Sequence, residues 1–196
     1  MAKKAGLDTP AMLVTTQKTE AIAFKKEHTS IINKSIKDSF TGTFEGIYYY
    51  NHTERVSDEI LEKLDEEFFP TLFQEEIPKA YELRVIFVHE KMWVGAIMSQ
   101  SDPKTSLDWR NYNHQNPNRI VPYKLPKEVE EKIRKFPQLA DLNTGAIDMI
   151  VSKDKRYVFW SAIPTVKSAW YQKNVIIQSK NTSLIFWQNH ERKRNG

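Results

Sequence analysis

The chain has 196 residues, a formal net charge of +4 and a mean hydropathy of −0.59. This length can form one domain or two small ones around a buried core, and 40% hydrophobic with 12% aromatic residues predicts a folded chain. No apolar run reaches the roughly 18 residues of a membrane span, and the start Met-Ala-Lys-Lys is not a secretion signal. The lack of cysteine excludes disulfides, thiolate zinc sites and a cysteine nucleophile, and it fits a reduced cytoplasmic location.

The positive charge is concentrated in the last thirty residues. Between Lys167 and Gly196 lie six of the 29 lysines and arginines but one of the 25 acidic residues. The rest of the chain is close to neutral and offers no broad basic surface for a phosphate backbone. We therefore expect neither a nucleic-acid partner nor a membrane partner.

The first eighty residues alternate short strands with short helices. Apolar periodicity and turn residues predict a strand at 12–16, a helix from about 19 to 28 and a strand at 31–36. A turn-rich loop at 37–46 precedes a strand at 47–50, a short acidic helix at 57–64 and a strand at 71–74.

The next eighty residues contain two hairpins around one helix. The first hairpin joins strands at 82–88 and 92–98, and the second joins strands at 145–150 and 157–159. Between them, Pro126 suits a first helical position, and Val129, Ile133 and Phe136 form an apolar stripe at helical spacing. Strands and helices mixed without regular βαβ alternation predict the α+β class.

The pattern changes after Phe159. Residues 165–196 show no sustained period of 2 or 3.6, and three of the five tryptophans fall at positions 160, 170 and 187. Disordered tails are poor in tryptophan and isoleucine, so this composition suits neither a fold nor a tail.

No single motif in the chain is diagnostic of a chemistry. The sequence has no GxxxxGK[ST], HExxH or GxSxG pattern, and its five histidines lack the spacing of metal ligands. What stands out is an ordered series of polar residues at strand ends and in loops. The series consists of Lys34, Gln74, Glu75, Glu76, Glu82, Arg84, Asp108, Arg110, Asn111 and Asp148.

This series resembles the ATP-grasp ligases, and among them the peptide maturases that make graspetides, including the microviridin-type enzymes. The resemblance runs from Ala2 to Phe159. It rests on the runs FFPTLFQ (68–74), YELR (81–84), DWRNY (108–112), PYKLP (122–126) and LNTGAID (142–148). It implies an α+β ATP-grasp fold with a central lobe at 1–78, a partial C-terminal lobe at 79–159 and a nucleotide cleft between them.

The resemblance also implies a role for each residue of the series. Lys34 matches the lysine that reaches the ATP phosphates, and the loop from Asp38 to Gly46 would cover them with backbone amides. Gln74, Glu75 and Glu76 match the hinge whose backbone reads adenine, and Glu82 matches the acid that holds the ribose hydroxyls. Arg110, as the catalytic residue, and Asn111 match the pair that faces the triphosphate and the acyl phosphate, and Asp148 matches a magnesium ligand.

Plainer interpretations stand beside these roles. Lys34 can be a solvated lysine at a strand end, and the loop can be an ordinary surface turn. Glu82 can be a cross-strand partner of Arg84 or of a lysine.

The implied reaction uses ATP and Mg²⁺ and acts on a ribosomal precursor peptide. ATP phosphorylates a side-chain carboxylate to an acyl phosphate, and a hydroxyl or amine of the same peptide displaces phosphate to form an ester or an amide. The transferring phosphoryl group requires cations and aligned donors, which a guanidinium and a lysine supply. The resemblance leaves a homo-oligomer open.

The sequence departs from the family after Phe159. There the family continues with Leu-Glu-x-Asn-Pro, whose Glu and Asn complete the magnesium site, but Ser161 and Ile163 occupy these positions here. A lone Asp148 is a poor site for an ion that prefers several oxygen ligands. We therefore expect this chain to be inactive as it stands.

Two explanations of the departure compete, a pseudoenzyme and a reading-frame error. Restoring one T in a back-translation of the stretch that begins at Phe159 gives FLECNPNSQIGMVSEK, which contains the missing motif. The hypothesis is that residues 160–196 are a frameshifted tail. Met1 matches a point inside the family, which implies that the preceding N-terminal domain is absent.

Two other functions remain open. One is a ligase that joins an amino acid or a small peptide to a protein carboxylate with the same nucleotide residues. The other is a catalytically dead partner that holds a leader peptide for an intact maturase.

Overall fold

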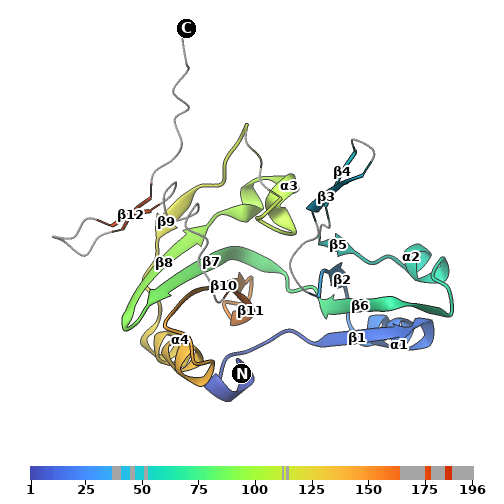
Figure 1. Ribbon diagram of the computed structural model, residues 1–196, viewed down its shortest axis with the longest axis horizontal. Coiled ribbons are helices and arrows are strands. Elements are labelled where there is room, and N and C mark those ends of the chain that lie inside the picture. The colour runs from blue at the N-terminus through green and yellow to red at the C-terminus, as the bar shows by residue number, and fades with distance from the viewer. Residues whose placement is uncertain are drawn as a thin grey trace, which may run out of the picture. The chain divides into compact units, whose positions relative to one another are not determined.

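The computed structural model divides the chain into two compact units (Figure 1). It describes residues 1–36, 53–111, 113 and 115–163 in full, and the backbone of residues 41–44, 47–50, 175–177 and 184–186. Unit 1 comprises Met1–Asp8, Ala80–Met98 and Arg119–Gly196, and unit 2 comprises Thr9–Lys79 and Ser99–Asn118. This grouping places residues 1–8 in unit 1 and residues 79 and 99–118 in unit 2, whereas the predicted lobes divide the chain once, after residue 78.

Unit 1 is built on a five-stranded sheet in the order β11-β10-β7-β8-β9. Its strands are β7 (Lys79–Val88), β8 (Lys91–Ile97), β9 (Ile120–Pro122), β10 (Thr144–Ser152) and β11 (Tyr157–Ile163). The two predicted hairpins are the antiparallel pairs β7–β8 and β10–β11. Two short strands, β12 (Val175–Ile177) and β13 (Leu184–Phe186), pair with each other.

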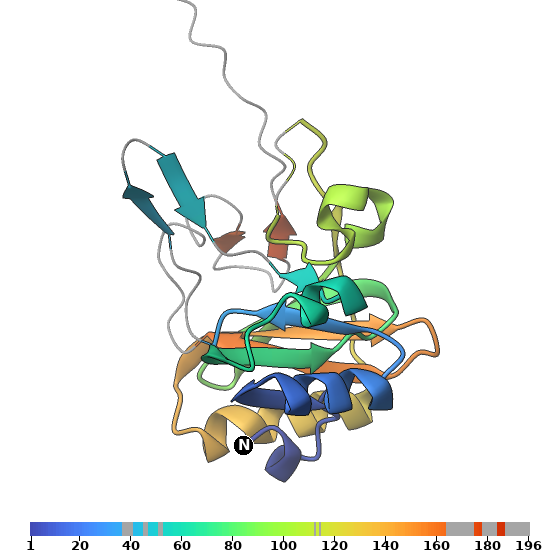
Figure 2. The same cartoon turned by 90° about the vertical axis from the view of Figure 1, so that its right-hand side faces the viewer.

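One face of this sheet carries the core of unit 1. Helix α4 (Lys127–Leu139) packs Ile133 and Phe136 into a cluster that contains Leu83, Val85, Phe87, Ile147 and Met149. The N-terminal 3-10 turn η1 (Lys3–Ala5) adds Ala5 to the cluster and lies beside α4 (Figures 1 and 2). Because strand side chains alternate, Glu82, Arg84 and Asp148 point to the opposite face of the sheet.

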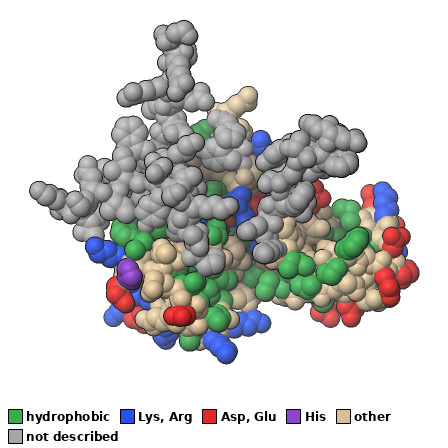
Figure 3. Space-filling view, in the orientation of Figure 1, with side chains coloured by type: hydrophobic (Ala, Val, Ile, Leu, Met, Phe, Trp, Pro, Cys, Tyr) green, Lys and Arg blue, Asp and Glu red, His purple; other side chains and the backbone are tan. Residues whose placement is uncertain are grey.

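Unit 2 is built on a four-stranded sheet in the order β1-β6-β2-β5. Its strands are β1 (Met12–Gln17), β2 (Ile31–Lys34), β5 (Glu54–Arg55) and β6 (Glu67–Glu75). Helix α1 (Lys18–Glu27) contributes Ala21, and α2 (Asp58–Glu62) contributes Leu61, to a cluster around Ile31 and Phe73. Apolar side chains also gather on the surface over β1 and β6, where Met12, Val14 and Phe69 are exposed (Figure 3).

Side-chain caps mark where two short helices of unit 2 begin. The Ser57 hydroxyl caps α2 by accepting a hydrogen bond from the Ile60 amide at 3.3 Å, and Asp58 and Glu59 favour the first turn. The segment 99–118 adds the 3-10 turn η2 (Ser99–Ser101) and α3 (Pro103–Ser106), which Asp102 caps through the Lys104 amide. The remaining strands, β3 (Thr41–Phe44) and β4 (Ile47–Tyr50), form a hairpin.

The predicted α+β class is confirmed, and the differences are local. The predicted strand at 71–74 is the longer β6, the predicted turn-rich loop contains β3, and Pro126 is the N-cap of α4 rather than its first residue. The first residues of the predicted tail, Trp160 to Ile163, continue β11. Apart from the backbones of β12 and β13, residues 164–196 lie outside the described part of the chain. Within that part, no helix is long and apolar enough to cross a membrane.

Candidate functional site

The predicted site residues are divided between the two units. Unit 2 holds Lys34, Gln74, Glu75, Glu76, Arg110 and Asn111, and unit 1 holds Glu82 and Asp148. The predicted phosphate loop, Asp38 to Gly46, is described only as the backbone of β3, and its other residues lie outside the described chain.

Strand pairing brings Lys34 and Gln74 to the same face of the unit 2 sheet. In the β2–β6 register Ile32 faces Gln74 and Lys34 faces Leu72, whereas Asn33 faces Phe73. Because Phe73 belongs to the apolar cluster, Lys34 and Gln74 lie on the other face of the sheet. Lys34 faces Leu72, and Leu72 lies two residues before Gln74 on β6. A cation and an amide at this spacing on one face suit a ligand with an anionic end and a polar planar end.

Among the residues that the structure describes, the buried side chain of Gln74 has no hydrogen-bond partner. Its exposed fraction is 0%, and neither Nε2 nor Oε1 is hydrogen-bonded within the described residues. Buried amides are normally paired, because leaving the group unpaired costs about 1–3 kcal/mol. An amide with one donor side and one acceptor side complements a heterocyclic edge that also offers a donor beside an acceptor.

The residues after Gln74 are already engaged inside unit 2. The Glu75 amide donates to the Ala11 carbonyl at 3.0 Å, and the Glu76 amide donates to the Ser30 carbonyl at 2.9 Å. Both amides are therefore used in the fold.

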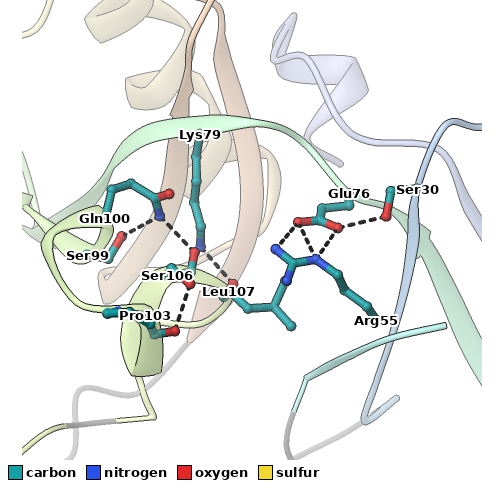
Figure 4. A network of polar contacts seen from close by, with 9 residues as sticks. All are labelled: Ser30, Arg55, Glu76, Lys79, Ser99, Gln100, Pro103, Ser106 and Leu107. Atoms are coloured by element: carbon teal, nitrogen blue, oxygen red, sulfur yellow. Dashed lines mark hydrogen bonds and ion pairs between the residues drawn. The ribbon is translucent and has the colours of Figure 1, made fainter. Parts of the chain in front are cut away.

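The Glu76 carboxylate forms a fixed pair with Arg55 (Figure 4). Arg55 donates to it through Nε at 2.8 Å and Nη2 at 2.7 Å, and the Ser30 hydroxyl donates at 2.8 Å. Burial raises the pKa of Glu76, but the hydrogen bonds from Arg55 and Ser30 outweigh it and leave this pKa below its usual value. Glu76 therefore serves the fold of the hinge through its side chain.

Lys79, which the sequence analysis did not single out, ties the hinge to the segment that carries Arg110. Its side chain is buried, and Nζ donates to the Leu107 carbonyl at 2.7 Å, one residue after α3 (Figure 4). The position of Lys79 directly after Pro78 was the one sequence feature that could have drawn attention to this residue. Its local sequence does not identify a hydrogen-bond partner 28 residues away.

Arg110 is held in one orientation by Asp108. Its Nε lies 2.9 Å from Oδ1 and its Nη2 lies 3.0 Å from Oδ2, a two-point contact that fixes the guanidinium plane. Burial raises the pKa of Asp108, but the hydrogen bonds and charge of Arg110, with a hydrogen bond from Thr53, outweigh it and lower this pKa to about 2. The Asn111 amide donates to the Asp108 carbonyl at 3.0 Å, so one short turn positions both predicted residues.

In unit 1, Asp148 is buried beside Arg84 and Ser161. Arg84 Nε lies 2.7 Å from Asp148 Oδ1, and this contact is an ion pair whose angles do not meet those of a hydrogen bond. Arg84 Nη2 donates a hydrogen bond to Asp148 Oδ2 at 3.3 Å. The Ser161 hydroxyl donates to Oδ2 at 3.2 Å. The β10–β11 register places Ser161 directly opposite Asp148, after an irregularity between Asp148 and Met149. Glu82 is buried two residues before Arg84, on the same face of β7.

These residues do not fit a resident Mg²⁺ ion. Mg²⁺ prefers six oxygen ligands in octahedral geometry and is usually bound through carboxylates. Here the Asp148 carboxylate faces a guanidinium and a hydroxyl, and Ile163 lies two residues beyond Ser161. Within the described chain, no three Asp, Glu or His side chains lie close enough to share a metal ion.

A separate cavity in unit 1 contains none of the predicted site residues. Its volume is about 160 Å³, and it lies between the β7–β8 turn and the end of α4, lined in part by His89, Lys91, Arg134 and Asn143. We assign no role to it.

Comparison with solved structures identifies the fold. A RiPP-associated ATP-grasp ligase of Chryseobacterium gregarium, solved with ADP and a leader and core peptide, is 30% identical, with a TM-score of 0.80 over 86% of this chain and 51% of that one. The macrocyclase MdnC of Microcystis aeruginosa MRC, bound with precursor peptide MdnA, is 33% identical, with a TM-score of 0.72 over 86% of this chain and 52% of that one. The macrocyclase MdnB of the same organism is 25% identical, with a TM-score of 0.57 over 83% of this chain and 48% of that one.

Other comparisons found no match. No protein-family model and no curated protein matches the chain. The chain spans about half the length of the solved structures that it resembles. The predicted ATP-grasp fold and the resemblance to RiPP-associated ATP-grasp ligases are thus confirmed over most of the chain.

Proposed function

We propose that this chain is the nucleotide-binding part of an ATP-grasp ligase that crosslinks a ribosomally made precursor peptide. The observation that carries the proposal is the likeness, at 30% and 33% identity, to two ligases solved with their peptides, one of them with ADP. The amide of Gln74, which has no hydrogen-bond partner among the described residues, and the cation of Lys34 on the same sheet face support a bound adenine nucleotide.

The proposed roles follow from the chemistry of each side chain. Gln74 pairs with the donor and acceptor of the adenine edge, and Lys34 neutralises phosphate charge. Arg110, held in plane by Asp108, donates to phosphoryl oxygens as charge shifts during transfer. Asn111 supports the same group from the next residue, and Glu82 accepts hydrogen bonds from the ribose hydroxyls.

In the parent reaction, a carboxylate oxygen of the peptide attacks the γ-phosphorus, which breaks the bond to ADP and forms an acyl phosphate. A peptide hydroxyl or amine then attacks the acyl carbon, loses its proton and expels phosphate. This chain is proposed to bind the nucleotide without carrying out these two reaction steps, because the Asp148 carboxylate forms an ion pair with Arg84 and accepts a hydrogen bond from Ser161.

Calorimetric titration with ADP tests the proposal. The full chain is expected to bind one ADP, and Lys34→Ala is expected to weaken binding by about ten-fold, the loss of one charge-assisted contact. Lys26→Ala is the matched control, because Lys26 is an exposed lysine on α1 in the same unit. Absence of binding, or equal losses in the two variants, would contradict the proposal.

The alternative of a catalytically dead, peptide-holding partner makes a different prediction. Such a protein would bind a leader peptide equally well with and without ADP, and Lys34→Ala would change neither affinity. An amino-acid or small-peptide ligase of the same fold would bind ADP as proposed, but its parent enzyme would modify a protein carboxylate in a product assay.

A further inference from the structure

We propose that Thr53 is a positioning residue for Arg110 and that it acts through the Asp108 carboxylate. Thr53 does not belong to the polar series that the resemblance singles out. The inference rests on the proposed function, because it concerns how Arg110 is held for the phosphoryl groups of a bound nucleotide. All three residues belong to unit 2.

The Asp108 carboxylate joins Thr53 to Arg110. Its Oδ2 atom accepts hydrogen bonds from the Thr53 hydroxyl at 2.7 Å and from Arg110 Nη2 at 3.0 Å. Its Oδ1 atom accepts from Arg110 Nε at 2.9 Å and from the Arg110 amide at 3.1 Å. The side chain of Asp108 is 13% exposed, whereas that of Arg110 is 41% exposed. The carboxylate is thus largely covered, while the guanidinium that it holds remains accessible from solvent.

Thr53 connects the Arg110 turn to a distant part of the chain. Asp108 and Arg110 lie in one short turn, so their mutual contacts fix the guanidinium only relative to that turn. Lys79 holds the backbone just before the turn through the Leu107 carbonyl. Thr53, which lies 55 residues before Asp108, holds the carboxylate that orients the guanidinium. Its hydrogen bond therefore constrains the direction of Arg110 more closely than the backbone contact does.

The anchoring residue lies at the level of Lys34 in the unit 2 sheet. In the antiparallel β2–β5 pair, Glu54 faces Asn33. Paired positions run in opposite directions along antiparallel strands, so Thr53, which precedes β5, comes level with Lys34, which ends β2. The turn that carries Arg110 is thereby anchored at the end of β2 at which Lys34 lies. These are the two cations that the proposed function assigns to phosphate groups.

The orientation of a guanidinium matters for phosphate because it binds through two parallel hydrogen bonds. Removal of the Thr53 hydroxyl leaves the Asp108–Arg110 contact in place but lets the turn move together with its guanidinium. The expected loss is therefore in the placement of Arg110 and in the affinity for phosphoryl groups, and it requires no loss of the fold.

The test measures the affinity of the full chain for AMPPNP, an ATP analogue with three phosphates, by calorimetry. Thr53→Val keeps the branched shape but removes the donor, and it is expected to weaken binding by about ten-fold. Thr53→Ser keeps the hydroxyl and should bind within about two-fold of the wild type. Thr29→Val is the matched control and should leave the affinity unchanged, since Thr29 is an exposed threonine of the same unit.

A double-mutant cycle separates positioning from a merely structural role. Because Thr53 acts through Arg110, adding Thr53→Val to Arg110→Ala should weaken AMPPNP binding by less than about two-fold further. A further loss of about ten-fold in the double variant overturns the inference and leaves the proposed function standing. Wild-type affinity in Thr53→Val, or an equal loss in Thr53→Ser, has the same consequence.

Absence of both ADP and AMPPNP binding in the wild-type chain overturns the proposed function. In that case, amide hydrogen exchange decides without nucleotide whether Thr53 holds the turn. The Arg110 amide donates to Asp108 Oδ1, and the Asn111 amide donates to the Asp108 carbonyl. Thr53→Val should speed the exchange of both amides by about ten-fold, and Thr53→Ser should restore the wild-type rates. Equal exchange in the wild type and in Thr53→Val overturns the inference.

Discussion

Replacing Gln74 by methionine is expected to stabilise the fold and to weaken nucleotide binding. The two side chains have similar size and flexibility, so the substitution chiefly removes an amide whose Nε2 and Oε1 are buried without partners among the described residues. The unpaired amide costs about 1–3 kcal/mol in the free protein, and removing it should raise the free energy of unfolding by a similar amount. For a chain of this length the melting temperature should rise by about 2–12 °C.

The same substitution should lower ADP affinity, because methionine cannot pair with the adenine edge. Urea unfolding followed by tryptophan fluorescence measures the stability change, and an unchanged dependence on denaturant shows that compactness is preserved. Calorimetry measures the affinity.

Gln138→Met is the matched control for both measurements. Gln138 is exposed on α4, so its replacement should change the unfolding free energy by less than about 0.5 kcal/mol and leave ADP affinity unchanged. If Gln74→Met lowers stability and leaves ADP affinity unchanged, the amide is part of the structure and our interpretation of it is wrong.

Three further substitutions test the supporting geometry. Gly145→Ala should lower the free energy of unfolding by about 1–3 kcal/mol, because the added Cβ atom would lie 2.6 Å from the Phe87 ring. Denaturant unfolding measures this loss, and an unchanged free energy of unfolding would contradict the prediction. Asp108→Asn should lower the free energy of unfolding by roughly 2 kcal/mol above pH 4, because the folded protein holds the pKa of Asp108 at about 2, below its ordinary value. The stabilisation from the ionised Asp108 carboxylate is lost as the pH falls toward 2. Unfolding curves across the acid range should show this difference vanish, whereas a pH-independent difference would refute the assignment. Arg84→Met should cost about 3–5 kcal/mol, because it removes the positive charge beside the buried Asp148 carboxylate. Arg84→Met combined with Asp148→Leu should recover most of that loss, and additive losses would show that the pair is not coupled.

Local patterns predicted the elements whose signals are strong. The strands of both hairpins alternate or run apolar between turn residues, and α4 has a clear apolar stripe, so each was predicted at nearly its observed place. Strand β5 is two residues long and β9 three, and strands of that length carry too few positions to show a period. Each exists because a neighbouring strand offers an edge.

The contacts that shape the candidate site could not be predicted from local sequence. The Arg84–Asp148 pair joins residues 64 positions apart, and the alternation of β7 had suggested only that Glu82 and Arg84 share a face. The irregularity between Asp148 and Met149 decides that Ser161 faces Asp148, and no local pattern marks it. The resemblance assigned predicted roles to the polar series, and the structure adds ion-pair partners for Glu76, Arg110 and Asp148.

Photolabelling with 2-azido-ATP tests the central claim of the account most directly, because the adenine itself forms the bond. Tryptic digestion releases residues 64–79 as one peptide, which contains Gln74, Glu75 and Glu76. The account predicts that label enters this peptide, that excess ADP prevents it, and that Gln74→Met reduces it. Labelling that ADP does not displace, or that falls on the cavity between the β7–β8 turn and α4, would contradict the assignment of the nucleotide site.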